Sequence, residues 1–140
     1  MPFQRILVAV DGSESSNRAL DKALELAVLT GAELYALAVE GPLPAYAATV
    51  GEVDEVKREK DAFFAGLVDD VCERAEAAGV AVEVDVRPGH VAELIVKVAS
   101  QRGADLIVLG RQGHFVRDHL LGSTADRVTE RANCPVMVVK

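Results

Sequence analysis

The sequence of 140 residues predicts one α/β domain, residues 1–140, in which a parallel β-sheet carries helices on both faces. Half of the residues are hydrophobic, which is enough to bury a complete core. Short, continuous apolar runs, typical of strands that are buried on both faces, alternate strictly with segments of helical periodicity. Such alternation implies parallel strands joined by right-handed crossovers.

The first strand is expected over residues 5–10, a continuous apolar run. Asp11, Gly12 and Ser13 follow it with turn residues and a candidate N-cap for the next helix. That helix has one apolar face at helical spacing, and Gly31 supplies its stop. The face consists of Leu20, Ala23, Leu24, Ala27 and Val28.

The middle of the chain predicts two strands with a long helix between them. Residues 33–39 read as the second strand, and residues 41–51, which contain two prolines and show no period, read as a loop. A charged helix is expected over about residues 54–78 before Gly79. Residues 80–86 predict a strand with one more solvent-exposed face. The apolar side of the helix is expected to contain Phe63, Phe64, Leu67, Val68, Val71 and Cys72.

The last part of the chain predicts two further helices and two further strands. One helix is expected to carry the apolar positions within residues 91–99 and to stop at Gly103. Residues 105–109 read as the fourth strand, Ser123 opens the last helix, and residues 135–139 read as the final strand. We therefore expect five strands and four helices in strict alternation.

The charge is unevenly distributed along the chain. Fifteen basic and 22 acidic side chains give a net charge of −7, and all of this excess lies in residues 1–70. Residues 71–140 are neutral overall. An acidic chain does not attract nucleic acid or an anionic membrane as a whole, so we expect neither as a partner.

The two cysteines, Cys72 and Cys134, lie far apart and show no metal-ligand spacing. A reducing, cytoplasmic location is the simplest interpretation of this cysteine content. No apolar run approaches the roughly 20 residues of a membrane-spanning helix, so no membrane insertion is expected.

The strongest functional signal is a glycine-bounded loop after the fourth strand. Gly110 and Gly113 are followed, after eight residues, by Gly122, Ser123 and Thr124. Glycines let backbone N–H groups approach an anion closely, and a helix N-terminus adds free donors and a positive dipole end. The pattern therefore suits a phosphate cradle, although from spacing alone a tight turn with an ordinary N-cap explains it equally well.

Asp11 ends the first strand, where ligands of open α/β sheets bind. Its carboxylate is suited to a ribose hydroxyl or to Mg²⁺ beside phosphates, and the alternative is a turn residue that caps the next helix. The loop after Gly110 also carries Arg111, His114, Arg117 and His119. Arginine fits phosphate oxygens well, but ordinary surface charge is the competing interpretation for each side chain.

Several enzyme signatures are absent from the sequence. It has no phosphate-binding Gly-x-x-x-x-Gly-Lys-[Ser/Thr] motif, no Gly-x-Gly-x-x-Gly after the first strand, and no Gly-x-Ser-x-Gly nucleophile motif. We therefore assign no catalytic residue.

Four motifs together resemble the universal stress protein family over essentially the whole chain. They are Ile6-Leu7-Val8-Ala9-Val10-Asp11-Gly12-Ser13, Gly110-x-x-Gly113, Leu120-Leu121-Gly122-Ser123 and Cys134-Pro135-Val136. The resemblance implies an open five-stranded parallel sheet of strand order 3-2-1-4-5, of the adenine nucleotide alpha hydrolase-like class. It also implies a homodimer that pairs the final strands, here Pro135–Val139.

The resemblance further implies an ATP site, because the ATP-binding branch of the family is marked by Gly-x-x-Gly, nine residues, and Gly-[Ser/Thr]. Here the gap, residues 114–121, has eight residues. A loop one residue shorter changes its reach by about 3.3 Å if extended, which could favour a shorter nucleotide such as AMP or ADP. Carried over from the family, the nucleotide-binding residues are Ala9, Val10, Asp11, Val39, Leu109, Gly110, Arg111, Gly113, Gly122, Ser123 and Thr124.

Three functions remain open at this point. The first hypothesis is a regulatory module that binds an adenine nucleotide, with Mg²⁺ as a further ligand and little or no hydrolysis. The second is a nucleotide-independent interaction protein that docks on a partner such as a transporter or kinase through its dimer surface or through residues 41–51, which include Tyr46. The third is an enzyme, either an ATPase or a nucleotidyl transferase.

Overall fold

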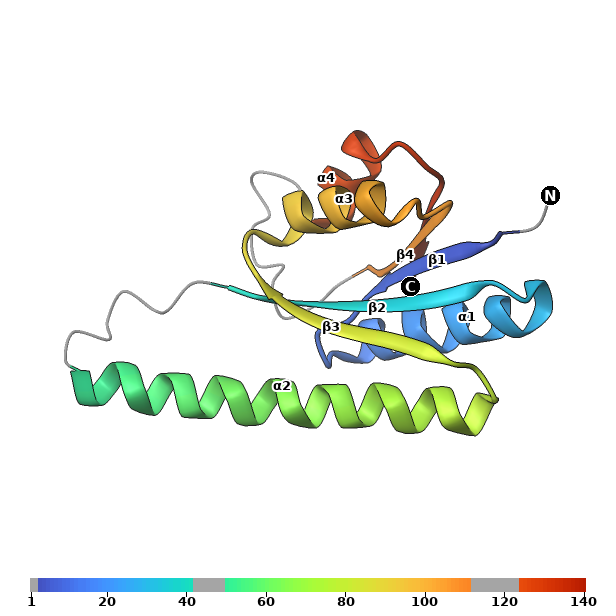
Figure 1. Cartoon of the computed structure of the whole chain (residues 1–140). Coiled ribbons are helices and arrows are strands. Elements are labelled where there is room, and N and C mark those ends of the chain that lie inside the picture. The colour runs from blue at the N-terminus through green and yellow to red at the C-terminus, as the bar shows by residue number, and fades with distance from the viewer. Residues whose placement is uncertain (1–2, 42–49, 112–123) are drawn as a thin grey trace.

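The computed structural model describes residues 3–41, 50–111 and 124–140, with the backbone alone for residues 50–53. Within these residues, five strands form one parallel sheet in the order β3-β2-β1-β4-β5, which confirms the expected topology (Figure 1). The strands are β1 (Arg5–Ala9), β2 (Glu33–Glu40), β3 (Val82–Pro88), β4 (Leu106–Gly110) and β5 (Val136–Val139). The helices are α1 (Glu14–Thr30), α2 (Val50–Ala78), α3 (Val91–Arg102) and α4 (Thr124–Arg131).

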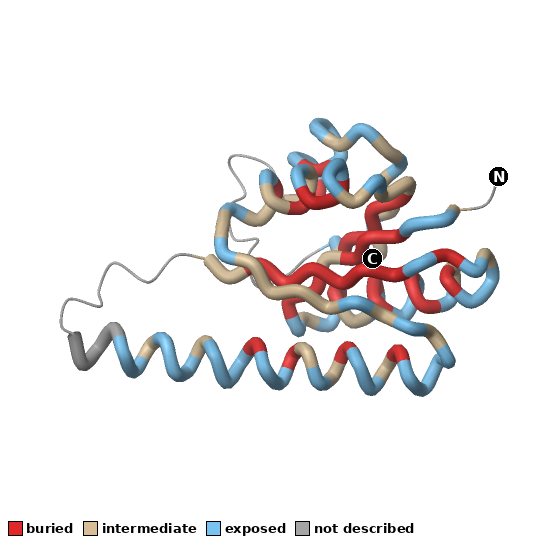
Figure 2. Tube along the Cα trace, viewed as in Figure 1, coloured by how far each residue is buried: buried red, intermediate tan, exposed pale blue. Residues whose placement is uncertain are grey.

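Helices cover both faces of the sheet. Helices α1 and α2 lie on one face, and α3 and α4 lie on the other (Figure 1). Side chains of β1 alternate between the two layers, so that Ile6 and Val8 pack with α1 and α2 while Leu7 packs with α3 and α4. Figure 2 shows the resulting buried core along β1, β2 and the inner faces of the helices.

Three helix ends follow the predicted glycine stops, and Gly79, directly after α2, has φ at 72°. Gly31 ends α1 with φ at 74°, and Gly103 ends α3 with φ at 67°. This left-handed conformation suits glycine, which has no Cβ. At the other end of α1, the N-cap is Ser13, whose hydroxyl accepts a hydrogen bond from the backbone N–H of Ser16.

The boundaries of α2 and β3 differ from the prediction. Helix α2 begins at Val50 rather than near residue 54, so the predicted loop ends earlier and Gly51 lies in the first helical turn. Glycine is tolerated at this end, because its entropic cost relative to alanine applies to the interior of a helix. Strand β3 begins at Val82 rather than at Val80, because the N–H of Val80 still closes the helix on the carbonyl of Ala75.

The apolar sides of two helices are narrower than predicted. In α2, the inward positions are Phe64, Leu67, Val71 and Ala75, all less than 10% exposed. Phe63 is 46% exposed and Cys72 is also exposed. In α1, Val28 is 59% exposed at the last turn. These side chains lie at the margins of the helical faces that pack on the sheet, so solvent still reaches them.

Strands β4 and β5 each begin one residue later than predicted. Asp105 precedes β4 and accepts hydrogen bonds from the backbone N–H groups of Gln4 and Arg5, which ties the start of β1 to the start of β4. Pro135 precedes β5, where its carbonyl accepts from the N–H of Ile107. No helix in the described part of the chain is both long and apolar enough to cross a membrane.

Candidate functional site

The predicted site residues that the structure describes gather at the carboxyl edge of the sheet. Strand β1 lies between β2 and β4, and Val8 pairs with Val108, so β1 and β4 end at the same level. The strand order reverses here, and ligands of open α/β sheets bind at such a point. The described site residues are Ala9, Val10, Asp11, Val39, Leu109, Gly110, Arg111 and Thr124. Gly113, Gly122 and Ser123 lie outside the described residues.

Asp11 organises the turn that follows β1. Only 8% of this residue is exposed. Its Oδ1 accepts hydrogen bonds from the backbone N–H of Ser13 at 2.9 Å and from the Ser13 hydroxyl at 2.6 Å. The backbone N–H of Asp11 donates to the hydroxyl of Ser16 at 2.9 Å. Asp11 is therefore a turn residue, as one interpretation proposed, but Ser13 rather than Asp11 caps the helix.

The turn points the start of α1 toward the end of β1. Gly12 has φ at 83°, a left-handed conformation that L side chains rarely adopt. The positive dipole end of α1 therefore lies next to a buried carboxylate at the carboxyl edge. The two together offer both an acceptor and a positively polarised surface to a small polar ligand.

Gly110 has a packing role that sequence reasoning missed. A Cβ added to Gly110 would lie 2.6 Å from both the carbonyl carbon and the hydroxyl oxygen of Ser15. Real Cβ atoms do not approach so closely, so any other residue would push the first turn of α1 away from β4. Gly110 thus holds α1 close to the proposed site, whether or not its own backbone contacts a ligand.

The other described site residues lie around the carboxyl edge of the sheet. Val39 and Leu109 are buried at the ends of β2 and β4. Arg111 is exposed, and its backbone N–H donates to the carbonyl of Val139, which links the end of β4 to β5. Thr124 begins α4 and is partly buried. His90 is the N-cap residue of α3 and makes no capping hydrogen bond through its side chain.

No cluster of three or more histidine, cysteine or acidic side chains suited to a metal ion occurs among the described residues. Asp11 supplies one carboxylate. Mg²⁺ is commonly held by one or two carboxylates together with substrate phosphates and water. The Asp11 carboxylate therefore fits Mg²⁺ only in company with a phosphorylated ligand.

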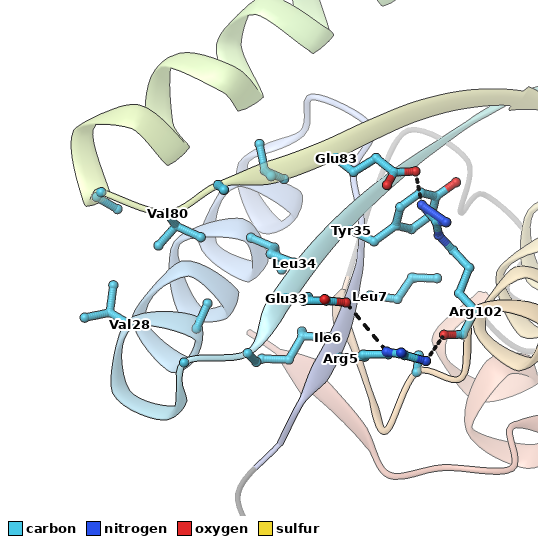
Figure 3. A pocket seen from close by; sticks show the side chains of 18 of the residues that line it. Arg5, Ile6, Leu7, Val28, Glu33, Leu34, Tyr35, Val80, Glu83 and Arg102 are labelled. Atoms are coloured by element: carbon cyan, nitrogen blue, oxygen red, sulfur yellow. Dashed lines mark hydrogen bonds and ion pairs between the residues drawn. The ribbon is translucent and has the colours of Figure 1, made fainter.

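A groove lies at the opposite, amino edge of the sheet (Figure 3). Its volume is about 980 Å³, and it is open to solvent between the ends of α1, α2 and α3. The Arg5 guanidinium lies 3.6 Å from the Glu33 carboxylate and also donates to the carbonyl of Arg102. The Arg102 guanidinium binds Glu83. Figure 3 shows both ion pairs within the groove.

The aromatic ring of Tyr35 lies at the side of this groove. The guanidinium carbon of Arg102 is 3.8 Å from the ring centroid, which is a cation–π contact. The Tyr35 hydroxyl donates to Asp85 at 2.8 Å. Burial raises the pKa of Tyr35, and the Asp85 carboxylate adds to the rise. Hydrogen bonds from Arg87 and Tyr35 hold the pKa of Asp85 below its ordinary value.

Sequence reasoning missed two more contributors to the carboxyl edge. The hydroxyl of Ser16 accepts a hydrogen bond from the backbone N–H of Asp11, a contact that the predicted N-cap at Ser13 did not by itself indicate. Lys60 of α2 donates from Nζ to the carbonyl of Gly41, just after β2, at 2.8 Å. No local signal predicts that contact, because it joins residues from different elements.

Comparison with known families matches residues 2–140 to the universal stress protein family. The chain is 33% identical over 147 residues to the universal stress protein YxiE of Bacillus subtilis, and the match covers 99% of each protein.

Solved structures of similar proteins share the fold. The universal stress protein UspA from Lactobacillus plantarum has a TM-score of 0.85 at 27% identity, covering 100% of this chain and 99% of that one. A universal stress protein in complex with cAMP has a TM-score of 0.79 at 29% identity, with coverage of 100% and 99%. A universal stress protein from Archaeoglobus fulgidus in complex with dAMP has a TM-score of 0.66 at 25% identity, with both chains fully covered. The match along almost the entire sequence, together with this shared sheet topology, means that the chain belongs to the universal stress protein family.

Proposed function

We propose that the chain is a regulatory module that binds an adenine nucleotide at the carboxyl edge of its sheet. The observation that carries this proposal is the buried Asp11 turn, which lies at the point where strand order reverses and beside the start of α1. Two structurally similar family members were solved with cAMP and dAMP, which supports an adenine nucleotide as the ligand class.

Each proposed contact is carried over from the universal stress protein family to the matching position of this chain. Ala9, Val10 and Leu109 would pack on the nucleoside, Val39 would offer its backbone to adenine, and Asp11 would accept from a ribose hydroxyl. The phosphates would lie against backbone N–H groups and hydroxyls after β4, with Arg111 as a neighbouring cation. Those phosphate-side residues are Gly113, Gly122, Ser123 and Thr124, whereas Gly110 would lie along the nucleoside.

ATP is the proposed physiological ligand, with ADP or AMP as alternatives and Mg²⁺ held jointly by Asp11 and the phosphates. The test is titration calorimetry of nucleotide-free protein with ATP, ADP and AMP, each with and without Mg²⁺. We expect heat with at least one nucleotide, and tighter binding of ATP in Mg²⁺ if the carboxylate takes part. No heat with any nucleotide would reject the proposal.

The phosphate side can be tested separately with Gly113→Val and Gly122→Val. Each change would place a branched side chain where a phosphate is proposed to lie, so we expect nucleotide binding to be lost. Affinity retained in both variants would contradict the assignment of the loop.

We also propose a homodimer in which β5 pairs with the β5 of a second copy. Strand β5 is the last strand of the sheet, and Val138 is 41% exposed there. Such an apolar edge favours pairing with another strand. We expect a dimer by light scattering and a monomer for Val138→Lys. A monomeric unmodified protein would exclude this dimer.

The proposed location is the reducing cytoplasm, where the free thiols of Cys72 and Cys134 would persist. Docking on a transporter or kinase through residues 41–51 remains the alternative function, and most of that segment lies outside the described residues. Deletion of residues 42–50 would abolish capture of a partner if that alternative holds, while leaving nucleotide affinity unchanged.

A further inference from the structure

Helix α2 brings an aromatic side chain to the carboxyl edge. The helix runs along one face of the sheet and continues past that edge (Figure 1). A Cβ added to Gly12 would lie 3.5 Å from Cζ of Phe63, so the ring lies against the turn that Asp11 organises. Nevertheless, 46% of Phe63 is exposed.

The position of this ring is well defined by its neighbours. Phe64 is 9% exposed, and its ring meets that of Phe63 edge to face, with centroids 5.2 Å apart and an interplanar angle of 80°. One turn earlier, Lys60 ties α2 to the carbonyl of Gly41. Residues 60–64 of α2 therefore span from the end of β2 to the turn after β1.

Packing of the core does not account for the exposed part of this ring. The buried contacts of α2 are made by Phe64, Leu67, Val71 and Ala75, and Phe63 lies at the margin of that stripe. The ring lies beside the turn after β1, at the edge of the sheet where the nucleoside is proposed to bind. An apolar aromatic surface at such a place suits the face of a heterocyclic base.

We propose that Phe63 is a wall of the base pocket and contacts the face of the purine ring. This inference rests on the proposed function and deepens it, because it assigns recognition of the base to α2, an element outside the glycine-containing loops. The contact selects for a flat, apolar ring system, whereas hydrogen bonds at the strand ends would orient that ring.

The test compares Phe63→Leu with Phe63→Tyr in calorimetric titrations with AMP. Leucine keeps an apolar side chain against Gly12 but removes the aromatic face, and tyrosine keeps both. Because leucine offers no aromatic face on which a base can stack, we expect Phe63→Leu to bind AMP about tenfold more weakly. Phe63→Tyr should bind within about twofold of the unmodified protein, because its ring stacks equally well.

Leu29→Ala serves as the matched control, because Leu29 is 75% exposed at the far end of α1. It should leave the affinity for AMP unchanged, and thermal unfolding should show that all three variants are folded. Equal affinity in Phe63→Leu and the unmodified protein would overturn the inference, as would equal losses in Phe63→Leu and Phe63→Tyr. Absence of binding by ATP, ADP and AMP in the unmodified protein would instead reject the proposed function itself.

Discussion

At the amino edge of the sheet, charged side chains form ion pairs with one another, whereas at the carboxyl edge one carboxylate organises a backbone turn. Arg5 pairs with Glu33 and Arg102 pairs with Glu83 across the groove. Asp11 instead accepts from the backbone N–H and the hydroxyl of Ser13. Mutually paired surface charges add little stability, while polar groups fixed by backbone geometry are preorganised for a ligand. A large groove is thus a weaker indication of function here than a small, well-ordered turn.

Gly110→Val should destabilise the carboxyl edge of the sheet more than any other change. The new side chain would overlap Ser15, so the first turn of α1 must move away from β4. Overpacking of this kind costs about 1–3 kcal/mol, and we expect that loss in the free energy of unfolding, together with loss of nucleotide binding. Chemical denaturation and calorimetry measure the two effects.

Gly66→Ala is the matched control for that experiment. Nothing lies within 4 Å of a Cβ added to Gly66, which is inside α2. An alanine there should raise the free energy of unfolding by about 0.5–1 kcal/mol through helix propensity. Equal stability of Gly110→Val and the unmodified protein would show that α1 does not depend on the close approach at Gly110.

Asp11→Ala should have the next largest effect. It removes the acceptor for the backbone N–H and hydroxyl of Ser13, so we expect a loss of about 1–2 kcal/mol in the free energy of unfolding. Asp11→Asn keeps one oxygen acceptor and should lose less. If the carboxylate also contacts ribose or Mg²⁺, both variants should bind ATP more weakly, whereas a purely structural role predicts normal binding by Asp11→Asn.

Arg102→Met should have a smaller effect and should spare nucleotide binding. The change removes the cation–π contact with Tyr35 and the ion pair with Glu83 while keeping an apolar stem. Because these groups are partly exposed, we expect a loss of less than about 1 kcal/mol. A marked change in ATP affinity would show that the two edges are coupled.

The smallest expected effect is a pH dependence from Asp85, in the middle of β3. Arg87 and Tyr35 lower the pKa of this carboxyl in the folded protein, so on acidification the unfolded chain takes up its proton first. The stabilisation is therefore present above about pH 3.9 and is lost as the pH falls through the folded pKa. Solvent screens this pair, so Asp85→Asn should reduce the acid sensitivity by less than about 1 kcal/mol. Identical acid unfolding curves would exclude this contribution.

Local sequence patterns were sufficient to predict the strands and helices, because burial and capping depend on neighbouring residues. Apolar runs and glycine stops identified the strands and the first three helices, and the glycines at positions 31, 79 and 103 adopt the expected left-handed conformation. The start of β3 was misplaced, because helix closure at Val80 competes with strand pairing. Phe63 was assigned to the apolar side of α2, since periodicity reports the direction of a side chain but not whether another element covers it.

The sequence by itself determined the α/β class, the order of the elements and the turn after β1, because burial on both strand faces and capping are encoded over a few residues. Only the tertiary structure decided why position 110 must be glycine and what Phe63 and Lys60 contact. Those features depend on α1 meeting β4 and on α2 reaching the ends of β1 and β2. Contacts between elements distant in sequence arise from packing in three dimensions, and no spacing along a single segment contains that information.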